Sequence, residues 1–304
     1  MLVNVLLLLI SVFLLWLGAD WLVESASYIA KKLNISELII GLTVVALGTS
    51  MPEFAVTIGA ALKGHAAISV ANVVGSDIFN LGIILGGVVL FQPIFLEKKM
   101  LWRDGSFLLS LSILLLIFSI DGHFSRLNGG IFLLLFVGYL LYLYVSKEKI
   151  LEEITVKPLG WKTFPMLIIG LAFIFLGARF LVEAATSIAL HFGVSEWLIG
   201  VTIVAAGTST PELATSIVAS YKRKPGLSIG NLIGSDIFNI SGVLGLAAFL
   251  HPLQTSREIT FNLYLMLGMI ALLLVFMRTQ WKLSRWEGAF LILFGMIRWL
   301  ININ

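Results

Sequence analysis

The chain has 304 residues, of which 59% are apolar and only 12% are charged, with a formal net charge of +3. Soluble globular domains carry about 25% charged residues, and the mean hydropathy here is +1.03. This composition excludes an ordinary soluble protein and predicts an integral membrane protein. The chain has no cysteine, which excludes a disulfide framework and a thiolate metal site.

Apolar runs of roughly 20 residues, the length that crosses a bilayer, recur along the whole chain. They predict an all-α polytopic membrane protein with ten transmembrane helices. The spans are expected at residues 2–30, 37–62, 67–91, 102–120, 126–146, 163–190, 196–221, 226–250, 259–277 and 284–302. The polar segment 147–162 between the fifth and sixth spans is too short for a soluble domain, and we expect a short linker there.

Lysine and arginine are distributed unequally between the two sides of this topology. Fifteen of them follow odd-numbered spans and four follow even-numbered spans or lie next to them. Because basic residues collect in cytoplasmic loops, we expect the linker to lie in the cytoplasm and both termini outside. The predicted location is the plasma membrane, crossed many times.

A carboxylate lies near the middle of the second span, in Gly48-Thr49-Ser50-Met51-Pro52-Glu53. An acid at a helix centre costs about 2.5–3.5 kcal/mol on insertion scales, so Glu53 is a functional-site hypothesis by default. Pro52 has no N–H and Gly48 tolerates an altered backbone, which predicts a broken helix with free carbonyls near Ala46–Thr49. Carbonyls, hydroxyls and a carboxylate together form the all-oxygen cluster that hard cations bind.

The same motif recurs 159 residues later as Gly207-Thr208-Ser209-Thr210-Pro211-Glu212. The segment Gly75-Ser76-Asp77-Ile78-Phe79-Asn80 also recurs, letter for letter, as Gly234-Ser235-Asp236-Ile237-Phe238-Asn239. One such motif alone would fit a capped helix start in a soluble protein. Two copies inside apolar spans argue against that interpretation and indicate an internal repeat.

Each copy of the repeat contains five predicted spans, an odd number, so the second copy enters the membrane from the opposite side. The chain is therefore predicted to consist of two inverted five-helix repeats, residues 1–146 and 163–304, with broken helices at spans 2 and 7. Inverted repeats are a recurring plan of secondary transporters, whose sites lie near the bilayer midplane. A pseudo-twofold axis would bring Glu53 and Glu212 into one site.

The polar residues of the third and eighth spans complete this predicted site. Ser76 and Asn80 are four residues apart and therefore share a helix face, and Ser235 and Asn239 repeat that spacing. Ca²⁺ takes about 6–8 oxygens in irregular geometry, whereas Mg²⁺ demands a near-ideal octahedron. One Ca²⁺ or two Na⁺ would neutralise two ionised glutamates, and a third Na⁺ could bind the neutral ligands. Protons compete for buried carboxylates on the same charge grounds.

Both motifs, each present twice in ten predicted spans, resemble those of the sodium/calcium exchangers of the cation/calcium antiporter superfamily, prokaryotic type. The resemblance covers essentially the whole chain. It implies antiport of Na⁺ for Ca²⁺ by alternating access, electrogenic with about three Na⁺ per Ca²⁺. The ligands that it implies are Ala46, Thr49, Ser50, Glu53, Ser76 and Asn80 in the first repeat and Ala205, Thr208, Ser209, Glu212, Ser235 and Asn239 in the second.

The chain departs from the pattern of that family at three positions. Relatives often carry an acid where this chain has Asn239, and many have a neutral residue where this chain has Asp77 and Asp236. The two aspartates are candidates for supporting the ligands from behind. The ordinary alternative is polar pairing between neighbouring helices.

Other functions were weighed against the antiporter. A Ca²⁺/H⁺ antiporter is the main alternative, and a cation channel is a weaker one because selectivity filters also use freed carbonyls. No Ser/His pair, zinc-binding His-x-x-x-His pattern or nucleotide motif lies within a span, so we expect neither an enzyme nor a cofactor. Na⁺, Ca²⁺ and the lipid bilayer are the expected partners, without nucleic acid or an obligatory protein partner.

Overall fold

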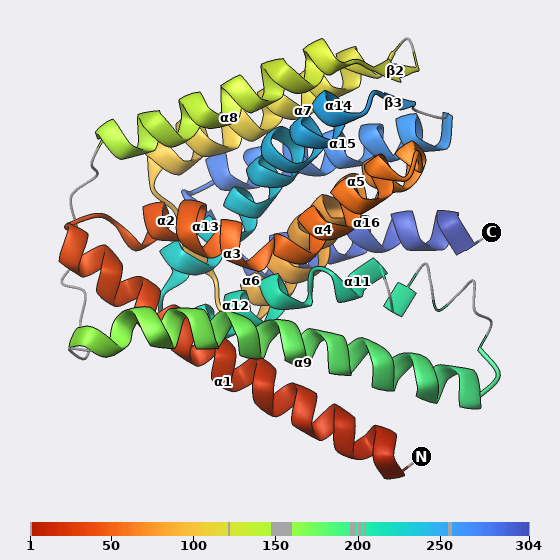
Figure 1. Ribbon diagram of the computed structural model, residues 1–304. Coiled ribbons are helices and arrows are strands. Elements are labelled where there is room, and N and C mark those ends of the chain that lie inside the picture. Colours follow the sequence, from red (N-terminus) through yellow and green to blue (C-terminus); the bar gives the residue numbers. More distant parts are fainter. Residues whose placement is uncertain are drawn as a thin grey trace.

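The computed structural model describes residues 2–120, 122–146, 160–194, 199, 202–203, 205–254 and 257–303. The fold is a bundle of helices that run roughly along one direction (Figure 1). Both chain termini lie at one end of the bundle, and the ends of α8 and α9 that flank the linker lie at the other. Most of the predicted linker, residues 147–159 with Lys147, Lys149 and Lys157, lies outside the described residues.

The helices follow the predicted repeats. The first repeat contains α1 (Leu2–Leu33), α2 (Glu37–Ile40), η1 (Gly41–Val45), α3 (Ala46–Thr49), α4 (Met51–Leu62), α5 (Ala66–Phe79), η2 (Asn80–Leu85), α6 (Gly86–Phe91), η3 (Met100–Gly105), α7 (Ser106–Phe118) and α8 (Arg126–Ser146). The second part contains η4 (Gly160–Lys162), α9 (Thr163–His191), α11 (Ala205–Gly207), α12 (Thr210–Tyr221), α13 (Pro225–Ile237), η6 (Phe238–Leu244), α14 (Gly245–Leu250), α15 (Arg257–Arg278) and α16 (Arg285–Ile303). The segments η1, η2, η3 and η6 are π-helical stretches within longer helices.

Within the described part of the chain, seven helices are long and apolar enough to cross a membrane, and a bent pair, Glu37–Thr49 with Met51–Leu62, is an eighth candidate. These eight coincide with predicted spans 1 to 6, 8 and 9. The tenth predicted span coincides with α16, and the seventh is described only in part, through α11 and α12. The protein is thus a multi-pass membrane protein, and the number ten stays a prediction.

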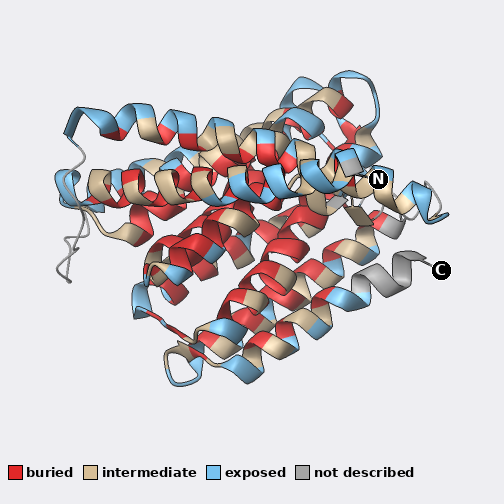
Figure 2. Ribbon diagram, turned by 90° about the horizontal axis from the view of Figure 1, so that it is seen from below, coloured by how far each residue is buried: buried red, intermediate tan, exposed pale blue. Residues whose placement is uncertain are grey.

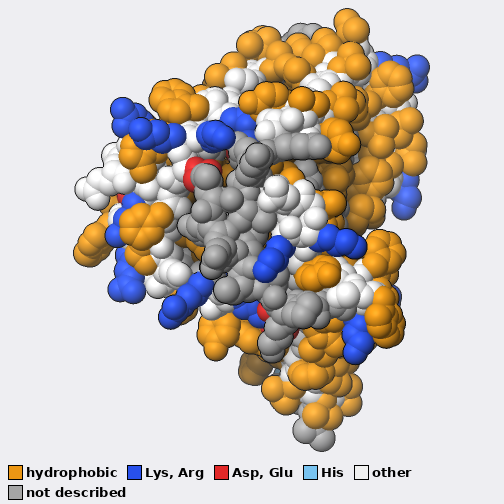
Figure 3. Space-filling model, turned by 90° about the vertical axis from the view of Figure 1, so that its left-hand side faces the viewer, with side chains coloured by type: hydrophobic (Ala, Val, Ile, Leu, Met, Phe, Trp, Pro, Cys, Tyr) orange, Lys and Arg blue, Asp and Glu red, His pale blue; other side chains and the backbone are white. Residues whose placement is uncertain are grey.

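Two continuous helical spans form the centre of the bundle. Ala66–Phe91 and Pro225–Leu250 are largely buried, whereas α1, α8 and α9 expose most of their side chains (Figure 2). Lipid tails give no hydrophobic driving force between helices, so close packing and polar contacts must select the helix neighbours. At the end of the bundle that faces the viewer in Figure 3, lysine and arginine side chains are spread among hydrophobic ones.

Four two-residue strands connect the two halves of the chain. β1 (Ile94–Phe95) pairs with β4 (Lys282–Leu283), and β2 (His123–Phe124) pairs with β3 (Leu253–Gln254), both antiparallel. A shift of 159 residues converts β1 into β3 and β2 into β4. The two ladders are therefore copies of each other, and each one joins a loop of the first half to a loop of the second.

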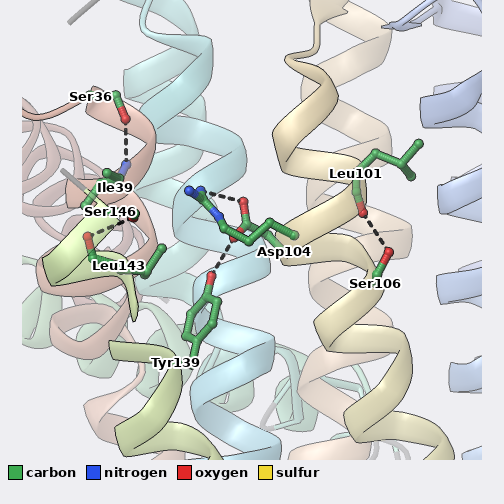
Figure 4. Close-up of polar contacts among 9 residues, drawn as sticks. Ser36, Ile39, Leu101, Asp104, Ser106, Tyr139, Leu143 and Ser146 are labelled. Atoms are coloured by element: carbon green, nitrogen blue, oxygen red, sulfur yellow. Dashed lines mark hydrogen bonds and ion pairs between the residues drawn. The ribbon is translucent and has the colours of Figure 1, made fainter. Parts of the chain in front are cut away.

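A buried polar cluster ties η3 to α8 (Figure 4). Arg103 Nε lies 2.6 Å from Asp104 Oδ1, and the Tyr139 hydroxyl donates to the same oxygen at 2.8 Å. The aspartate is fully buried, but it is paired with a cation and bonded to a phenol. Its charge is therefore compensated within the protein.

The pair α1 and α9 stands apart from the rest of the packing. The larger hydrophobic cluster comes mostly from α4 to α8 and α13 to α16, while the smaller cluster joins α1 and α9 to α2, η1 and α12. The two helices lie side by side (Figure 1), and their backbones touch at glycines. A Cβ added at Gly18 would lie 2.6 Å from Gly170 O, and one at Gly170 would lie 2.8 Å from Gly18 O.

Gly18→Ala should loosen the α1–α9 pair, because the new Cβ meets backbone that cannot move unless the whole helix shifts. Overpacking typically costs about 1–3 kcal/mol, so the detergent-solubilised variant should melt at a clearly lower temperature. Gly138→Ala in α8, where a Cβ meets nothing within 4 Å, is the matched control and should melt like the wild type. Equal melting temperatures for the two variants would contradict the close backbone contact.

Candidate cation site

The helix that carries Glu53 is bent by 51° between α3 and α4. Ser50 lies at the bend with φ −82° and ψ 12°, and Pro52 is in the first turn of α4. The second repeat has the same local structure, with Ser209 at φ −86° and ψ 9° before a proline in the first turn of α12. The predicted break in the second span is therefore present, at Ser50.

The bend does not free the Ala46 carbonyl, as the sequence had led us to expect. The Ser50 amide donates to Ala46 O at 3.0 Å, and Thr49 Oγ1 donates to it at 3.4 Å. The physical reason is the position of the proline. Pro52 lacks the N–H that would bond the carbonyl four residues back, which belongs to Gly48 rather than to Ala46.

Each glutamate is held by a serine of the other repeat. Ser50 Oγ donates to Glu212 Oε1 at 2.8 Å, and Ser209 Oγ donates to Glu53 Oε1 at 2.9 Å. All four side chains are fully buried. The structure thus brings both broken helices together at one place, as the predicted twofold axis requires.

The next helix of each repeat adds a second hydroxyl to the same carboxylate oxygens. Ser76 Oγ of α5 donates to Glu53 Oε1 at 3.4 Å, and Ser235 Oγ of α13 donates to Glu212 Oε1 at 3.3 Å. The second oxygens, Glu53 Oε2 and Glu212 Oε2, are buried and have no hydrogen-bond partner among the described residues. These two oxygens are the ones left for a ligand.

The site carries negative charge without a positive partner. The two glutamates are close enough to repel each other, and among the described residues no lysine or arginine forms an ion pair with either of them. An isolated buried carboxylate is strongly unfavourable in a medium of low dielectric constant. A cluster of three or more acidic or histidine side chains arranged as metal ligands is also not found in the described part of the chain. Cations bound here would therefore need neutral oxygens in addition to the two carboxylates.

Neutral oxygens are available at the two ligand asparagines. Asn80 Oδ1 and Asn239 Oδ1 are buried and have no hydrogen-bond partner among the described residues. Their amide nitrogens are bound elsewhere, to Asp236 and Asp77. Of the predicted ligands, six are joined by hydrogen bonds and two more present an unpaired amide oxygen.

The two threonines of the motif differ, although their sequence context is the same. Thr49 Oγ1 donates to Asn231 Oδ1 at 3.0 Å, whereas Thr208 Oγ1 has no hydrogen-bond partner within the described residues. Thr49 is fully buried and Thr208 is half-buried. The site is therefore symmetric at its glutamates and asymmetric at its threonines. Ala205 begins α11, and its side chain is outside the described set.

Asn72 and Asn231 belong to this network and were missed in the sequence. Asn72 Nδ2 donates to Thr57 Oγ1 at 3.0 Å, and Asn231 Nδ2 donates to Ser216 Oγ at 3.2 Å. A signal for both was available, because they are separated by the repeat offset of 159. Each also lies one helical turn before the site serine, on the face that carries the ligands.

Charged residues at the inner half of α1 hold it to the end of α12. Lys222 Nζ lies 2.6 Å from Asp20 Oδ1 and 2.7 Å from Glu24 Oε1. The repeat equivalents of these acids, Arg179 and Glu183, bond each other at 2.9 Å on the exposed surface of α9. The ion pairs of α1 and α9 are therefore not equivalent, although the two helices are.

Comparison with known proteins assigns the family. The family model described as "Sodium/calcium exchanger protein" matches residues 3–145 and 162–299, one segment in each predicted repeat. The chain belongs to the sodium/calcium exchanger family. The predicted resemblance to this family is thereby confirmed, and the two matched segments agree with the repeat boundaries.

Relatives of this family member match it over almost its whole length. The chain is 34% identical to the sodium/calcium exchanger MaX1 of Methanosarcina acetivorans, over 96% of both proteins. It is 33% identical to the inner membrane protein YrbG of Escherichia coli, over 100% of this chain and 99% of the other. A solved structure of the sodium-calcium exchanger NCX_Mj, soaked with 2.5 mM Na⁺ and 0.1 mM Ca²⁺, is similar with a TM-score of 0.86 and 32% identity, covering 97% of each chain.

Replacing either glutamate by glutamine should weaken cation binding. Glu53→Gln or Glu212→Gln leaves a single negative charge for a divalent ion, and we expect ⁴⁵Ca²⁺ binding to weaken at least tenfold, or by roughly 1.4 kcal/mol or more. The fold should survive, because the amide keeps the shape and can still accept the serine hydrogen bonds. Glu183→Gln, an exposed glutamate on α9, is the control and should bind as the wild type does. Wild-type affinity in either site variant would rule out a two-glutamate site.

Proposed function

We propose that this protein is a secondary antiporter that exchanges Na⁺ for Ca²⁺ across the membrane by alternating access. The observation that carries the proposal is the pair of buried glutamates whose hydrogen-bond partners are hydroxyls rather than cations. One Ca²⁺ neutralises their two charges, and so do two Na⁺. Competing occupancy of one site by a divalent ion or by several monovalent ions is what exchange requires.

The proposed ligands are hard oxygens from both repeats, the type that Ca²⁺ and Na⁺ prefer. The set comprises Ala46, Thr49, Ser50, Glu53, Ser76, Asn80, Ala205, Thr208, Ser209, Glu212, Ser235 and Asn239. The two alanines would contribute backbone carbonyls, and the Ala46 carbonyl keeps a lone pair besides the hydrogen bonds that it accepts. Twelve residues divided between two halves can supply more than one monovalent site.

Two inverted five-helix repeats in ten spans are the architecture that we propose for this chain. The hydrogen bonds around the glutamates support it, because a shift of 159 residues converts each bond into its counterpart in the other repeat. The two paired ladders support it in the same way. The excess of basic residues at one side places the linker in the cytoplasm, with both termini outside the plasma membrane.

The helices α1 and α9 are the proposed moving pair. They pack on each other through glycines and join the remaining helices through a separate, smaller hydrophobic cluster. Lys222 ties α1 to α12, and α9 has no equivalent ion pair with α4 within the described residues. This asymmetry is what one of two alternating states would have, since transporters of this plan move one bundle past a fixed site.

A Ca²⁺/H⁺ antiporter is the second candidate function. It is supported by the same buried carboxylates, because protons can neutralise them as Na⁺ does. A cation channel is less favoured, since a moving helix pair beside a buried site fits alternating access better than a continuous pore.

Transport in proteoliposomes should identify the coupling ion and the stoichiometry. Uptake of ⁴⁵Ca²⁺ should be driven by an outward Na⁺ gradient and not by equal K⁺ or H⁺ gradients. With three Na⁺ leaving for each Ca²⁺ entering, one net charge moves per cycle, worth about 2.3 kcal/mol per 100 mV. Uptake should therefore rise when valinomycin and K⁺ make the interior positive. Uptake that ignores voltage would point to two Na⁺ per Ca²⁺, and uptake driven by H⁺ alone would favour the second candidate.

Motion of α1 should be visible in this naturally cysteine-free chain. Ala26→Cys places a thiol on the fully buried side of α1, and Ala247→Cys places one equally buried in α14. We expect the reactivity of the first thiol toward a membrane-impermeant maleimide to differ several-fold between Na⁺-loaded and Ca²⁺-loaded protein, while the second stays unreactive. Identical labelling of the α1 thiol in both ions would count against a moving pair.

A further inference from the structure

Two hydrogen bonds cross between the repeats directly behind the proposed ligands. Asn80 Nδ2 donates to Asp236 Oδ1 at 2.9 Å, and Asn239 Nδ2 donates to Asp77 Oδ1 at 3.0 Å. All four side chains are fully buried. Each ligand asparagine is therefore held by an aspartate of the opposite repeat and not by its own neighbour in sequence.

An aspartate partner fixes which end of the amide faces the site. A primary amide has two N–H donors on its nitrogen and an acceptor oxygen, whereas a carboxylate only accepts. A flipped amide would set its oxygen against the carboxylate and turn its N–H groups toward a cation, and both contacts are repulsive. The observed bonds leave Asn80 Oδ1 and Asn239 Oδ1 buried and without a hydrogen-bond partner in the described part of the chain.

The free amide oxygens lie on the same helix faces as the site hydroxyls. Ser76 is one turn before Asn80 and donates to Glu53, and Ser235 is one turn before Asn239 in the other repeat. Asp77 follows Ser76 by one position, about 100° further round the helix. The aspartate therefore leaves from a different side of the helix and reaches the asparagine of the other repeat from behind.

We propose that Asp77 and Asp236 are positioning residues, each of which holds the ligand asparagine of the other repeat with its amide oxygen toward the cations. This inference rests on the proposed cation transport. A negative acceptor also polarises the amide, because charge-assisted hydrogen bonds are stronger than neutral ones. The asparagine oxygen thereby becomes a better ligand for a hard divalent ion, and the two aspartates help to set the affinity for Ca²⁺ without being ligands.

The test exchanges the two partners of one bond. Asp77→Asn removes the charged acceptor, Asn239→Asp sets two carboxylates against each other, and the double variant restores a donor and an acceptor with their roles reversed. We expect each single variant to raise the KM for Ca²⁺ uptake about tenfold, with Vmax changed less than about threefold, and the double variant to return to within about threefold of the wild type. Asp236→Asn with Asn80→Asp should give the same pattern.

Asp104→Asn is the matched control, because Asp104 is equally buried and is bonded to Arg103 and Tyr139 instead. It should lower the melting temperature without a change in KM. The same preparations are tested for thermal stabilisation by Ca²⁺ and by Na⁺, which reports binding independently of transport.

Each other outcome contradicts part of the argument. Single-variant effects that merely multiply in the double variant, or that lower Vmax at an unchanged KM, overturn the positioning role. A double variant that does not fold also overturns it, because the restored bond should hold the helices together. Wild-type protein that neither transports Ca²⁺ nor is stabilised by it overturns the proposed function itself, a result distinguishable from failure of the pair alone.

Discussion

The structure depends on two carboxylates that are buried in the membrane without a positive side chain beside them. Glu53 and Glu212 each accept hydroxyl hydrogen bonds from both repeats. Hydroxyls orient a carboxylate and leave its charge uncompensated, so the energetic cost of burial stays in place until cations or protons arrive. Asp104 shows the opposite solution in the same molecule, because its charge is balanced by Arg103.

The helices around the glutamates can be understood as the consequence of that constraint. Irregular backbone at membrane depth survives only where protein buries it or where it lines a cavity, and both bends lie against the two most buried spans of the described chain. Those spans contain the π-helical segments η2 and η6, which begin at Asn80 and Phe238. Such segments are frequent at functional sites, and here they accompany the ligand asparagines.

Symmetry and asymmetry have separate physical roles. The bonds at the glutamates and asparagines repeat almost identically, so the fixed part of the site treats the two sides of the membrane alike. The contacts of Thr49 and of Lys222 have no counterpart in the other repeat among the described residues. The differences thus lie where α1 and η1 meet the second repeat, which is where one side would be closed and the other opened.

The sequence by itself determined the membrane class, the repeat and most of the site. Apolar run length reports the spans, because the bilayer thickness fixes it, and an exact motif repeat reveals the two halves whatever their packing. Proline position predicted the bend, although the carbonyl it deprives belongs to Gly48. What only the tertiary structure decided were contacts between residues far apart in the chain. Ser50 bonds the glutamate of the other repeat, Asp77 bonds Asn239, and Lys222 selects α1, because side-chain pairing across repeats depends on how the helices cross, and that information is absent from local spacing.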